Sequence, residues 1–501
     1  MELLRTLRAS PCGLLIAASM SCIAAGGLSI GAAEPAAAVS STFEIRVGMP
    51  GFNDNGAGDG GAVDNRFQDG GGQVLTAGKL GFRPIDEPRS GSRFGAAITS
   101  SDLNGDGITD LIIGAPGWPS GPFPVPGHVY VSFGTATGIT PAGGVVLPDS
   151  AAVDDEFGAA LALSGRAEST TRDLWVGAPG RDVDGHADAG AIFHYTISPA
   201  GVASYLEEVT EDHADIPGNS APGNRFGEVL APGWWDGVVV GVPHYDVGAL
   251  EDAGAMLRLH TDHVTGMLIA ASRWTQNTAG VPGAAEAGDR FGAAVGTAGR
   301  IVGAPGEDLG RATDAGAAQI FLPSTTGDNT LTPGKLVTQN SPKVPGVVEP
   351  GDRFGSAVST GTFTCQERLM AAIGAPGEDL TAPRRGGKAK NAGSVTLVLV
   401  ENSEESCAST AISQGHGLPG MAETGDAVGT ALGQIPANPE LEEDAIDMLL
   451  IGAPGEDVAG VINTGRVMSM IGTRSSIPAK VFGFQGGDMT NLRYGSVLTS
   501  P

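Results

Sequence analysis

The most constraining feature of this chain is a repeat built from two short motifs that recur in phase. An aromatic residue followed by Gly occurs at Phe94, Phe157, Phe226, Phe291, Phe354 and Tyr494, with a copy that lacks the aromatic at Val428. A Gly-x-Pro turn starts at Gly48, Gly114, Gly177, Gly241, Gly303, Gly374 and Gly452. Subtracting these positions gives intervals of 66, 63, 64, 62, 71 and 78 residues, about twice the period of a helical solenoid repeat. Units of this length suit four strands with long loops, so the chain is a periodic array.

Residues 1–38 have the composition of a secretory signal peptide. Arg5 and Arg8 give a positive start, an apolar stretch begins at Leu14, and residues 36–38 offer a small-residue cleavage site. A membrane anchor is the alternative, but glycines and Glu34 interrupt the run before it reaches the roughly 20 apolar residues of a spanning helix. We therefore expect export, cleavage, and a secreted or cell-surface protein with no membrane span after cleavage.

The charge balance restricts the partners. The formal net charge is −27, which argues against nucleic acid and anionic membrane surfaces because those partners require clustered Lys and Arg. An acidic exported protein is instead suited to binding cations. The chain has 79 Gly among 501 residues, yet 41% of its residues are hydrophobic and they occur in regular short runs. We therefore expect a folded core.

The local signals within a repeat are those of short strands. "RFGAAI" (93–98) alternates large and small side chains, "LIIGAPG" (111–117) is a β-branched run stopped by Gly and Pro, and "GHVYVSF" (127–133) alternates again. With a looser fourth strand, each unit is one antiparallel sheet. A single such sheet cannot cover both of its faces, whereas radial packing of several sheets buries them and leaves only short edges. The sequence therefore predicts an all-β, seven-bladed β-propeller.

The two chain ends predict how the ring closes. Residues 43–63 contain a Gly-x-Pro strand and a third strand without an aromatic-Gly strand before them, and residues 492–501 supply an aromatic-Gly strand with nothing after it. Together the two fragments complete one four-stranded unit. We expect residues 43–501 to form a single propeller whose last blade joins both termini.

These motifs resemble the FG-GAP repeat family, which builds the seven-bladed propeller at the N-terminus of integrin α subunits. The best copies are "DRFGAAV" with "IVGAPGED" (289–308) and "DRFGSAV" with "AIGAPGED" (352–379). Two copies depart from the pattern: "GVPHY" (241–245) replaces Gly-Ala-Pro-Gly, and "DAVGTAL" (426–432) lacks the aromatic. The resemblance implies a ligand-binding face on the propeller and Ca²⁺ in loops between first and second strands.

One such loop, "DLNGDGITD" (102–110), carries the residues of a calcium site. Oxygen side chains at Asp102, Asn104, Asp106 and Asp110, with a backbone carbonyl near Ile108, are the hard ligands that Ca²⁺ prefers. The alternative is an acidic hairpin without metal, but its three carboxylates would repel one another without a cation. The equivalent loops of the other blades do not repeat the pattern, so we expect one structural Ca²⁺.

Two cysteines remain once the predicted signal is removed. Cys365 follows the first strand of its repeat and Cys407 lies between the third and fourth, so their connections emerge on the same face of an antiparallel blade. We expect a disulfide between them, with two buried thiols as the alternative. The mass of the non-reduced protein distinguishes these states.

The loops after the Gly-x-Pro turns form the candidate ligand face. They carry Trp118, Phe123, His186, His244 and Tyr245, and aromatic side chains of this kind commonly anchor protein and sugar ligands. The alternative for each residue is a side chain packed on its own loop. His244 and Tyr245 stand out because they displace the usual residues of the repeat.

Catalytic motifs are absent from the sequence: it has no Gly-x-Ser-x-Gly, no His-Glu-x-x-His and no Cys-x-x-Cys. We therefore expect a monomeric, non-enzymatic adhesion-type protein that binds an extracellular protein or glycan. The alternative is an extracellular hydrolase or lyase with an active site on the propeller axis, because residues from separate blades can converge there.

Overall fold

The structure is a computed structural model. It describes residues 44–52, 60–67, 72–82, 91–117, 127–135, 137–140, 145–147, 152, 154–165, 171–233, 237–262, 264–324, 330–363, 368–381, 387–401, 408–436, 447–458, 460–471, 479–482, 494 and 496–498. The chain clusters into Met1–Ser40 and Ser41–Pro501, and all described residues belong to the second unit. The predicted signal peptide therefore lies outside the described residues.

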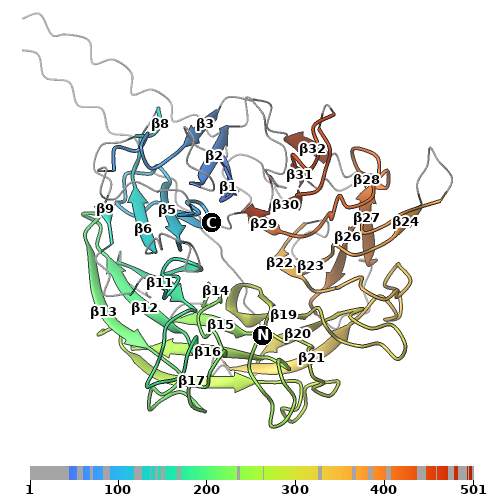
Figure 1. The fold of residues 1–501 in the computed structure, drawn as a ribbon, viewed down its shortest axis with the longest axis horizontal. Coiled ribbons are helices and arrows are strands. Elements are labelled where there is room, and N and C mark those ends of the chain that lie inside the picture. Colours follow the sequence, from blue (N-terminus) through green and yellow to red (C-terminus); the bar gives the residue numbers. More distant parts are fainter. Residues whose placement is uncertain are drawn as a thin grey trace, which may run out of the picture. The chain divides into compact units, whose positions relative to one another are not determined.

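Seven antiparallel sheets surround a common axis, which confirms the predicted all-β propeller (Figure 1). From the axis outward, blade 1 has β4 (Ala97–Ser101), β5 (Asp110–Ala115), β6 (His128–Ser132) and β9 (Val145–Val146). Blade 2 has β10 (Leu161–Gly165), β11 (Arg172–Ala178), β12 (Ala191–Ile197) and β13 (Ala203–Val209). Blade 3 has β14 (Val229–Pro232), β15 (Val238–Val242), β16 (Ala255–Thr261) and β17 (Leu268–Trp274). Blade 4 has β18 (Ala294–Val295), β19 (Ile301–Ala304), β20 (Ala317–Pro323) and β21 (Leu331–Val337).

The remaining blades follow the same order. Blade 5 has β22 (Ala357–Gly361), β23 (Met370–Ala375), β26 (Ser394–Leu399) and β27 (Thr410–Gln414), with β28 (Gly417–Leu418) added in parallel. Blade 6 has β29 (Leu432–Ile435), β30 (Met448–Ala453), β31 (Arg466–Ile471) and β32 (Ala479–Phe482). Two short hairpins, β7 (Gly134–Thr135) with β8 (Gly138–Ile139) and β24 (Leu380–Thr381) with β25 (Lys388–Ala389), lie outside the blades. Helical structure among the described residues is limited to one 3-10 turn, η1 (Thr297–Gly299).

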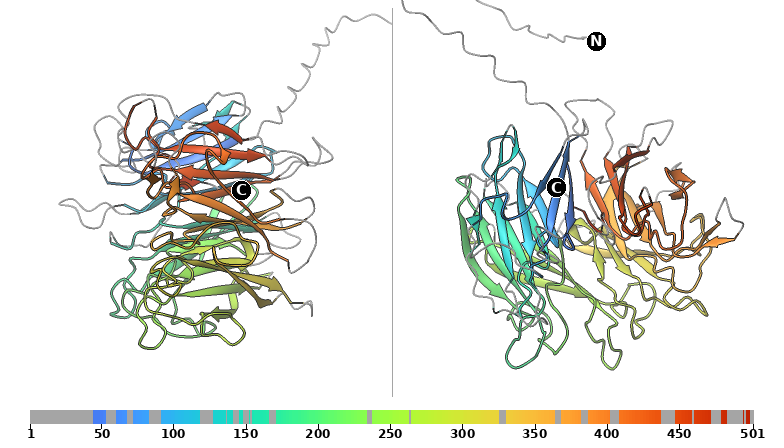
Figure 2. Two further views of the ribbon diagram at one scale, coloured as in Figure 1. Left: turned by 90° about the vertical axis from the view of Figure 1, so that its right-hand side faces the viewer. Right: turned by 45° about the horizontal axis from the view of Figure 1, so that its top comes forward.

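Blade 7 joins the two ends of the chain, as predicted. Its inner strand β33 (Val497–Leu498) pairs with β1 (Glu44–Met49), which is followed by β2 (Ala62–Phe67) and β3 (Gly72–Leu75). The pairing places Val47 opposite Leu498 and Gly48 opposite Val497. The ring is thus closed by hydrogen bonds between segments that lie at opposite ends of the sequence (Figure 2).

The aromatic-Gly pairs lie just before the first strands and not within them, which corrects the predicted strand boundaries. Phe94, for example, forms an isolated parallel bridge with Gly61 of the preceding blade, and β4 begins at Ala97. The aromatic ring is buried between the two blades. Val428 makes the same bridge and is equally buried, so blade 6 keeps the packing without the aromatic.

The hydrophobic core is divided among the interfaces between blades. The cluster around Phe157, for example, combines Ile112 and Val129 of blade 1 with Leu174 and Phe193 of blade 2. Six similar clusters occupy the other junctions. Each blade therefore depends on both neighbours for burial, which explains why a closed ring suits this sequence.

The recurring glycines allow backbones of adjacent blades to touch. A Cβ on Gly303 would lie 1.9 Å from the carbonyl oxygen of Gly355 in the next blade. Gly355 has φ of +95°, and its own Cβ would lie 2.3 Å from the carbonyl oxygen of Ala317. At the six junctions where both residues are described, the Gly of the Gly-x-Pro turn thus packs against the Gly of the next aromatic-Gly pair, so the two motifs recur together.

Within the part of the chain that the structure describes, no helix is long and apolar enough to cross a membrane.

Candidate functional site

The predicted calcium loop forms a tight turn held by its own side chains. The Asp102 carboxylate accepts hydrogen bonds from the amides of Gly105, at 2.7 Å, and Gly107, at 2.9 Å. Asn104 Oδ1 accepts from the Asp106 amide at 2.9 Å. Gly105 and Gly107 have φ of +77° and +81° with open space around a Cβ, so it is the left-handed backbone of the turn that favours glycine there.

Asp110 anchors this loop inside blade 1. Its carboxylate is buried and accepts from the amides of Leu103 and Gly134, at 2.9 and 2.8 Å. Burial raises the pKa of Asp110, and the charges of Asp106 and Asp102 add to the rise. Among the described residues, no three His, Cys, Asp or Glu side chains are grouped so as to hold a metal ion. The hard oxygen donors and their mutual repulsion nevertheless fit a cation at the turn.

The structure describes only part of the predicted ligand face. Trp118, Phe123, Cys365 and Cys407 lie outside the described residues, so the disulfide stays a prediction. His186 lies in the loop after the Gly-x-Pro turn of blade 2, where its backbone bridges Val183. The Tyr245 ring faces inward: it packs against the core between blades 2 and 3, and the Arg273 guanidinium carbon lies 4.3 Å from its centroid.

His244 lies in a polar cluster at the same turn of blade 3. Its Nδ1 is 2.9 Å from Asp252 Oδ1, and its Nε2 is 3.6 Å from Glu228 Oε2. A carboxylate can only accept, so Nδ1 donates to Asp252, while Nε2 faces Glu228. The imidazole is half-buried, which keeps it accessible from solvent.

Arg225 links this cluster to the neighbouring blade. Its Nε donates to Glu228 Oε2 at 2.9 Å, and its Nη2 donates to Glu156 of blade 2. Burial alone would lower the pKa of Arg225, but the bonds and charges of Glu156 and Glu228 raise it overall. The guanidinium therefore stays charged between two carboxylates.

Arg225 and Glu156 occupy the same position in successive repeats, directly before the aromatic. We call these positions the axial collar: Arg93, Glu156, Arg225, Arg290, Arg353 and Ala427. All six have left-handed backbones with φ between 53° and 57°. The first strands that follow them are the innermost strands of their blades (Figure 1), and those of neighbouring blades, such as β10 and β14, contact each other. The collar therefore surrounds one end of the axis, and Arg290 and Arg353 are exposed there.

Blade 3 departs from the repeat at several positions that meet in space. His244 stands where Gly180, Gly306, Gly377 and Gly455 stand in other blades, and a Cβ on those glycines would come within 2.2 Å of a backbone oxygen. Glu228 stands where the other repeats have Ala, Ser or Thr. Sequence reasoning singled out His244 but missed Glu228, Arg225 and Asp252. Alignment of the repeats against one another would have revealed Glu228.

A second polar feature recurs on the same face in blades 4, 5 and 6. The Asp before each axial collar residue is buried beside the Glu of the "PGED" turn, as in Asp289 with Glu307. Burial raises the pKa of Glu307 to about 7 and that of Asp289 to about 6. The Asp of the same turn has the turn-forming role that the sequence suggested, since Asp308 Oδ1 accepts from the Asp314 amide. The buried Glu was not predicted.

The family model of the FG-GAP repeat matches residues 94–132, which contain the aromatic-Gly pair, the 102–110 loop and the Gly-x-Pro turn of blade 1. Among curated proteins, the chain is 31% identical over 166 residues to phosphatidylinositol-glycan-specific phospholipase D of Homo sapiens, covering 28% of this chain and 19% of that protein. The Bos taurus protein of the same name is 31% identical over 163 residues, with the same coverage. The matched segment thus spans about a fifth of the length of these relatives.

Solved structures with a similar fold include the periplasmic gluconolactonase PpgL of Pseudomonas aeruginosa, with a TM-score of 0.37 and 13% identity over 75% of this chain and 83% of that one. The Dos1 propeller has a TM-score of 0.38 and 11% identity over 78% of this chain and 69% of that one.

The expectation that the protein is not an enzyme is contradicted by these matches, because the curated relatives are named as phospholipases. That expectation depended on the absence of contiguous catalytic motifs. A search for contiguous motifs overlooks side chains that different strands and blades bring together, as in the cluster around His244.

Proposed function

We propose that this chain is an exported hydrolase of phosphate esters with its active site at the axial collar. The scaffold of that site is a closed seven-bladed propeller that carries an FG-GAP repeat. The observation that carries the proposal is the His244 cluster. Blade 3 departs from the repeat sequence there, and the imidazole lies between Asp252 and Glu228. Departures from a local rule that coincide in space are typical of functional sites.

The substrate class comes from the relatives. Proteins named phosphatidylinositol-glycan-specific phospholipase D share 31% identity with part of this chain. Such a substrate would combine a phosphodiester with a glycan outside the membrane. Export of this chain, as its first 38 residues suggest, would bring it to substrates of that kind.

His244 would act as the general acid and base. In phosphodiester hydrolysis a water oxygen bonds to phosphorus, the bond from phosphorus to the alcohol oxygen breaks, and one proton passes from water to the leaving oxygen. An imidazole held by a carboxylate can carry that proton between the two oxygens. Asp252 would be a positioning residue, because it contacts Nδ1, and the substrate would meet Nε2 beside Glu228.

The collar arginines would hold the phosphate. Arg290 and Arg353 are exposed on the collar and form no ion pair among the described residues. Guanidinium groups bind phosphate oxygens through paired hydrogen bonds. They supply local positive charge in a chain whose net charge is −27.

This proposal predicts turnover by the purified full chain on a glycosylphosphatidylinositol substrate, followed by phosphorus NMR. Arg290→Gln and Arg353→Gln should each raise KM by about tenfold, the effect of losing one charge-assisted hydrogen bond. Arg311→Gln is the matched control, because Arg311 is exposed in the turn of blade 4 outside the collar. No turnover by the wild-type chain, or equal effects of all three substitutions, would contradict the proposal.

We also propose a structural Ca²⁺ in the 102–110 loop, held by Asp102, Asn104, Asp106 and Asp110 with the Ile108 carbonyl. Binding would stabilise blade 1 by roughly 2.7 kcal/mol at a Ca²⁺ concentration of 100 times Kd. Asp106→Asn should therefore show a smaller rise of Tm on adding Ca²⁺ than the wild type in differential scanning calorimetry. Asp184→Asn, at an exposed turn of blade 2, should behave like the wild type. An unchanged response of Asp106→Asn would refute the loop site.

A further inference from the structure

We propose that blades 4 and 5 each hold a hard metal cation between two carboxylates and a glutamine amide oxygen, on the face of the Gly-x-Pro turns. The ligands are Gln276, Asp289 and Glu307 for blade 4, and Gln339, Asp352 and Glu378 for blade 5. Carboxylate and amide oxygens are ligands of Ca²⁺. These sites lie at the opposite end of the blades from the 102–110 loop.

Unpartnered oxygens mark both sites. In blade 4, Gln276 Nε2 donates to Glu307 Oε2 at 2.5 Å and the Glu286 amide donates to Asp289 Oδ2 at 2.6 Å. Gln276 Oε1 and Asp289 Oδ1 have no hydrogen-bond partner among the described residues, although the two residues are only 2% and 1% exposed. A buried acceptor without a donor or a cation raises the free energy of the folded state.

Blade 5 repeats this arrangement. Gln339 Nε2 donates to Glu378 Oε2, and the Glu349 amide donates to Asp352 Oδ2 at 2.7 Å. Gln339 Oε1 and Asp352 Oδ1 are again buried and unpartnered. Two successive repeats therefore leave the same pair of oxygens unsatisfied.

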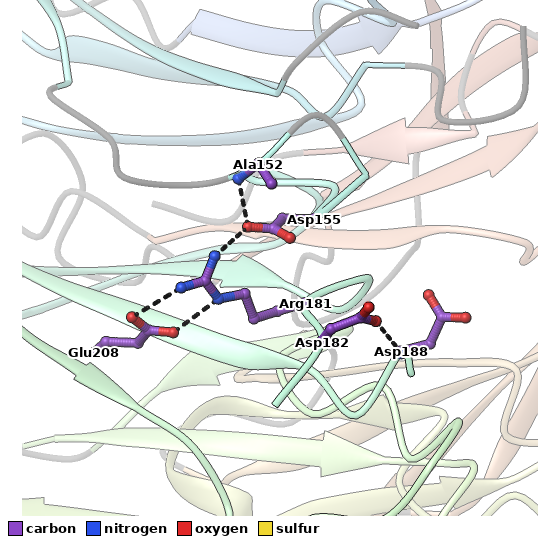
Figure 3. Close-up of polar contacts among 6 residues, drawn as sticks. All are labelled: Ala152, Asp155, Arg181, Asp182, Asp188 and Glu208. Carbon is purple, nitrogen blue, oxygen red and sulfur yellow. Dashed lines mark hydrogen bonds and ion pairs between the residues drawn. The ribbon is translucent and has the colours of Figure 1, made fainter. Parts of the chain in front are cut away.

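At the corresponding position of blade 2, the chain itself supplies a positive charge between two carboxylates (Figure 3). Arg181 stands where blade 4 has Glu307. Its Nη1 is 2.8 Å from Asp155 Oδ2 and its Nε is 3.0 Å from Glu208 Oε1. A guanidinium thus neutralises two carboxylates at the position that is acidic in blades 4 and 5.

The other blades on this side of the ring also provide a guanidinium. In blade 6, Arg466 Nη1 lies 2.8 Å from Glu456 Oε1. At the junction of blades 2 and 3, Arg273 Nη2 lies 2.5 Å from Glu211 Oε1. Among the described residues, Asp289 and Glu307 form no ion pair with any basic side chain, and in blade 5 Lys388 lies at the surface and pairs with Glu349.

A cation and a shared proton are the two ways in which these oxygens can be satisfied. A proton on one oxygen donates to the other and joins both in one hydrogen bond, whereas a cation binds both directly. We favour the cation because blades 2 and 6 place a guanidinium beside the corresponding carboxylates.

Two of the three blade 5 ligands border open space. Gln339 and Glu378 line an open cavity of about 360 Å³ together with Ser394, Ser413 and His416. The hydroxyl groups and water molecules in such a cavity can complete the coordination of a Ca²⁺, which takes 6–8 oxygen ligands.

Calcium titration of the full chain by isothermal calorimetry tests the proposal, in an Asp106→Asn background that removes the loop site. Adding Glu307→Gln or Glu378→Gln should each remove one equivalent of bound Ca²⁺. Glu208→Gln, the same chemical change at the blade 2 site that Arg181 occupies, should remove none. Unchanged stoichiometry in the Glu307→Gln and Glu378→Gln variants would overturn the proposal.

Glu307→Arg provides a second readout that does not depend on the isosteric variant folding well. This substitution copies the Arg181 arrangement of blade 2, so it should lose the same equivalent of Ca²⁺ and keep in chelator the Tm that the parent has with Ca²⁺. If Glu307→Gln and Glu307→Arg both raise Tm equally with and without Ca²⁺, the site holds a proton only and the proposal fails.

Discussion

Replacing His244 by Gln is expected to lower kcat for phosphodiester hydrolysis by roughly 10²- to 10⁴-fold, the usual contribution of a positioned general acid or base. Glutamine keeps a polar group of similar size but cannot carry the proton between water and the leaving oxygen. KM should change little, because Arg290 and Arg353 remain in place. Initial rates of the two proteins at saturating substrate measure the effect.

Two further variants make this prediction specific. Asp252→Asn removes the carboxylate that lies 2.9 Å from His244 Nδ1, so the imidazole loses its orientation and kcat should fall by about tenfold or more. His186→Gln changes the histidine in the equivalent loop of blade 2, where no partner of its side chain is described, and should leave kcat unaltered. Full activity of His244→Gln would exclude the proposed acid-base role.

Replacing Tyr494 by Ala should destabilise the protein by roughly 3–5 kcal/mol, the cost of removing a buried aromatic side chain. Tyr494 is fully buried, its hydroxyl donates to Asp64 Oδ2 at 2.8 Å, and its amide donates to the Thr464 carbonyl. The residue thus joins blade 6 to blade 7 at the place where the ring closes. Chemical denaturation followed by tryptophan fluorescence provides the change in the free energy of unfolding.

Comparison with an aromatic inside the ring reveals whether the ends are joined. Phe291→Ala removes the equivalent side chain between blades 3 and 4, which are continuous in sequence. Closure predicts that Tyr494→Ala costs about as much as Phe291→Ala. Tyr494→Phe should cost about 1–2 kcal/mol, since the ring is kept and only the polar contacts of the hydroxyl with Asp64 and Arg66 are lost. A cost below about 0.5 kcal/mol for Tyr494→Ala, typical of a surface position, would indicate a frayed terminus.

The blade number and the closure were predictable because they follow from steric rules that repeat along the chain. Gly303 and Gly355 must both lack a side chain for neighbouring backbones to touch. The sequence therefore shows glycine at both positions of successive repeats. The strand boundaries were less predictable. Phe94 belongs to a bridge between blades and not to β4. The local sequence pattern does not distinguish a residue within a strand from a buried residue that packs between two sheets.

The polar sites were only partly predictable. His244 stood out because it breaks a motif, but its partners Glu228 and Asp252 lie 16 and 8 residues away by subtraction and carry no motif of their own. The blade 4 set is harder still, because Gln276 comes from the end of the blade 3 outer strand and reaches Glu307 in the next blade. Contacts of this kind depend on the placement of whole blades.

The position of a bound substrate analogue tests the proposed function most directly. A crystal structure of the full chain with a non-hydrolysable phosphonate analogue of the phosphodiester should show the phosphonate at the axial collar, with His244 Nε2 within hydrogen-bond distance of one of its oxygens and a collar arginine on the others. A phosphonate bound at any other surface, in a protein that hydrolyses the parent ester, would contradict the account.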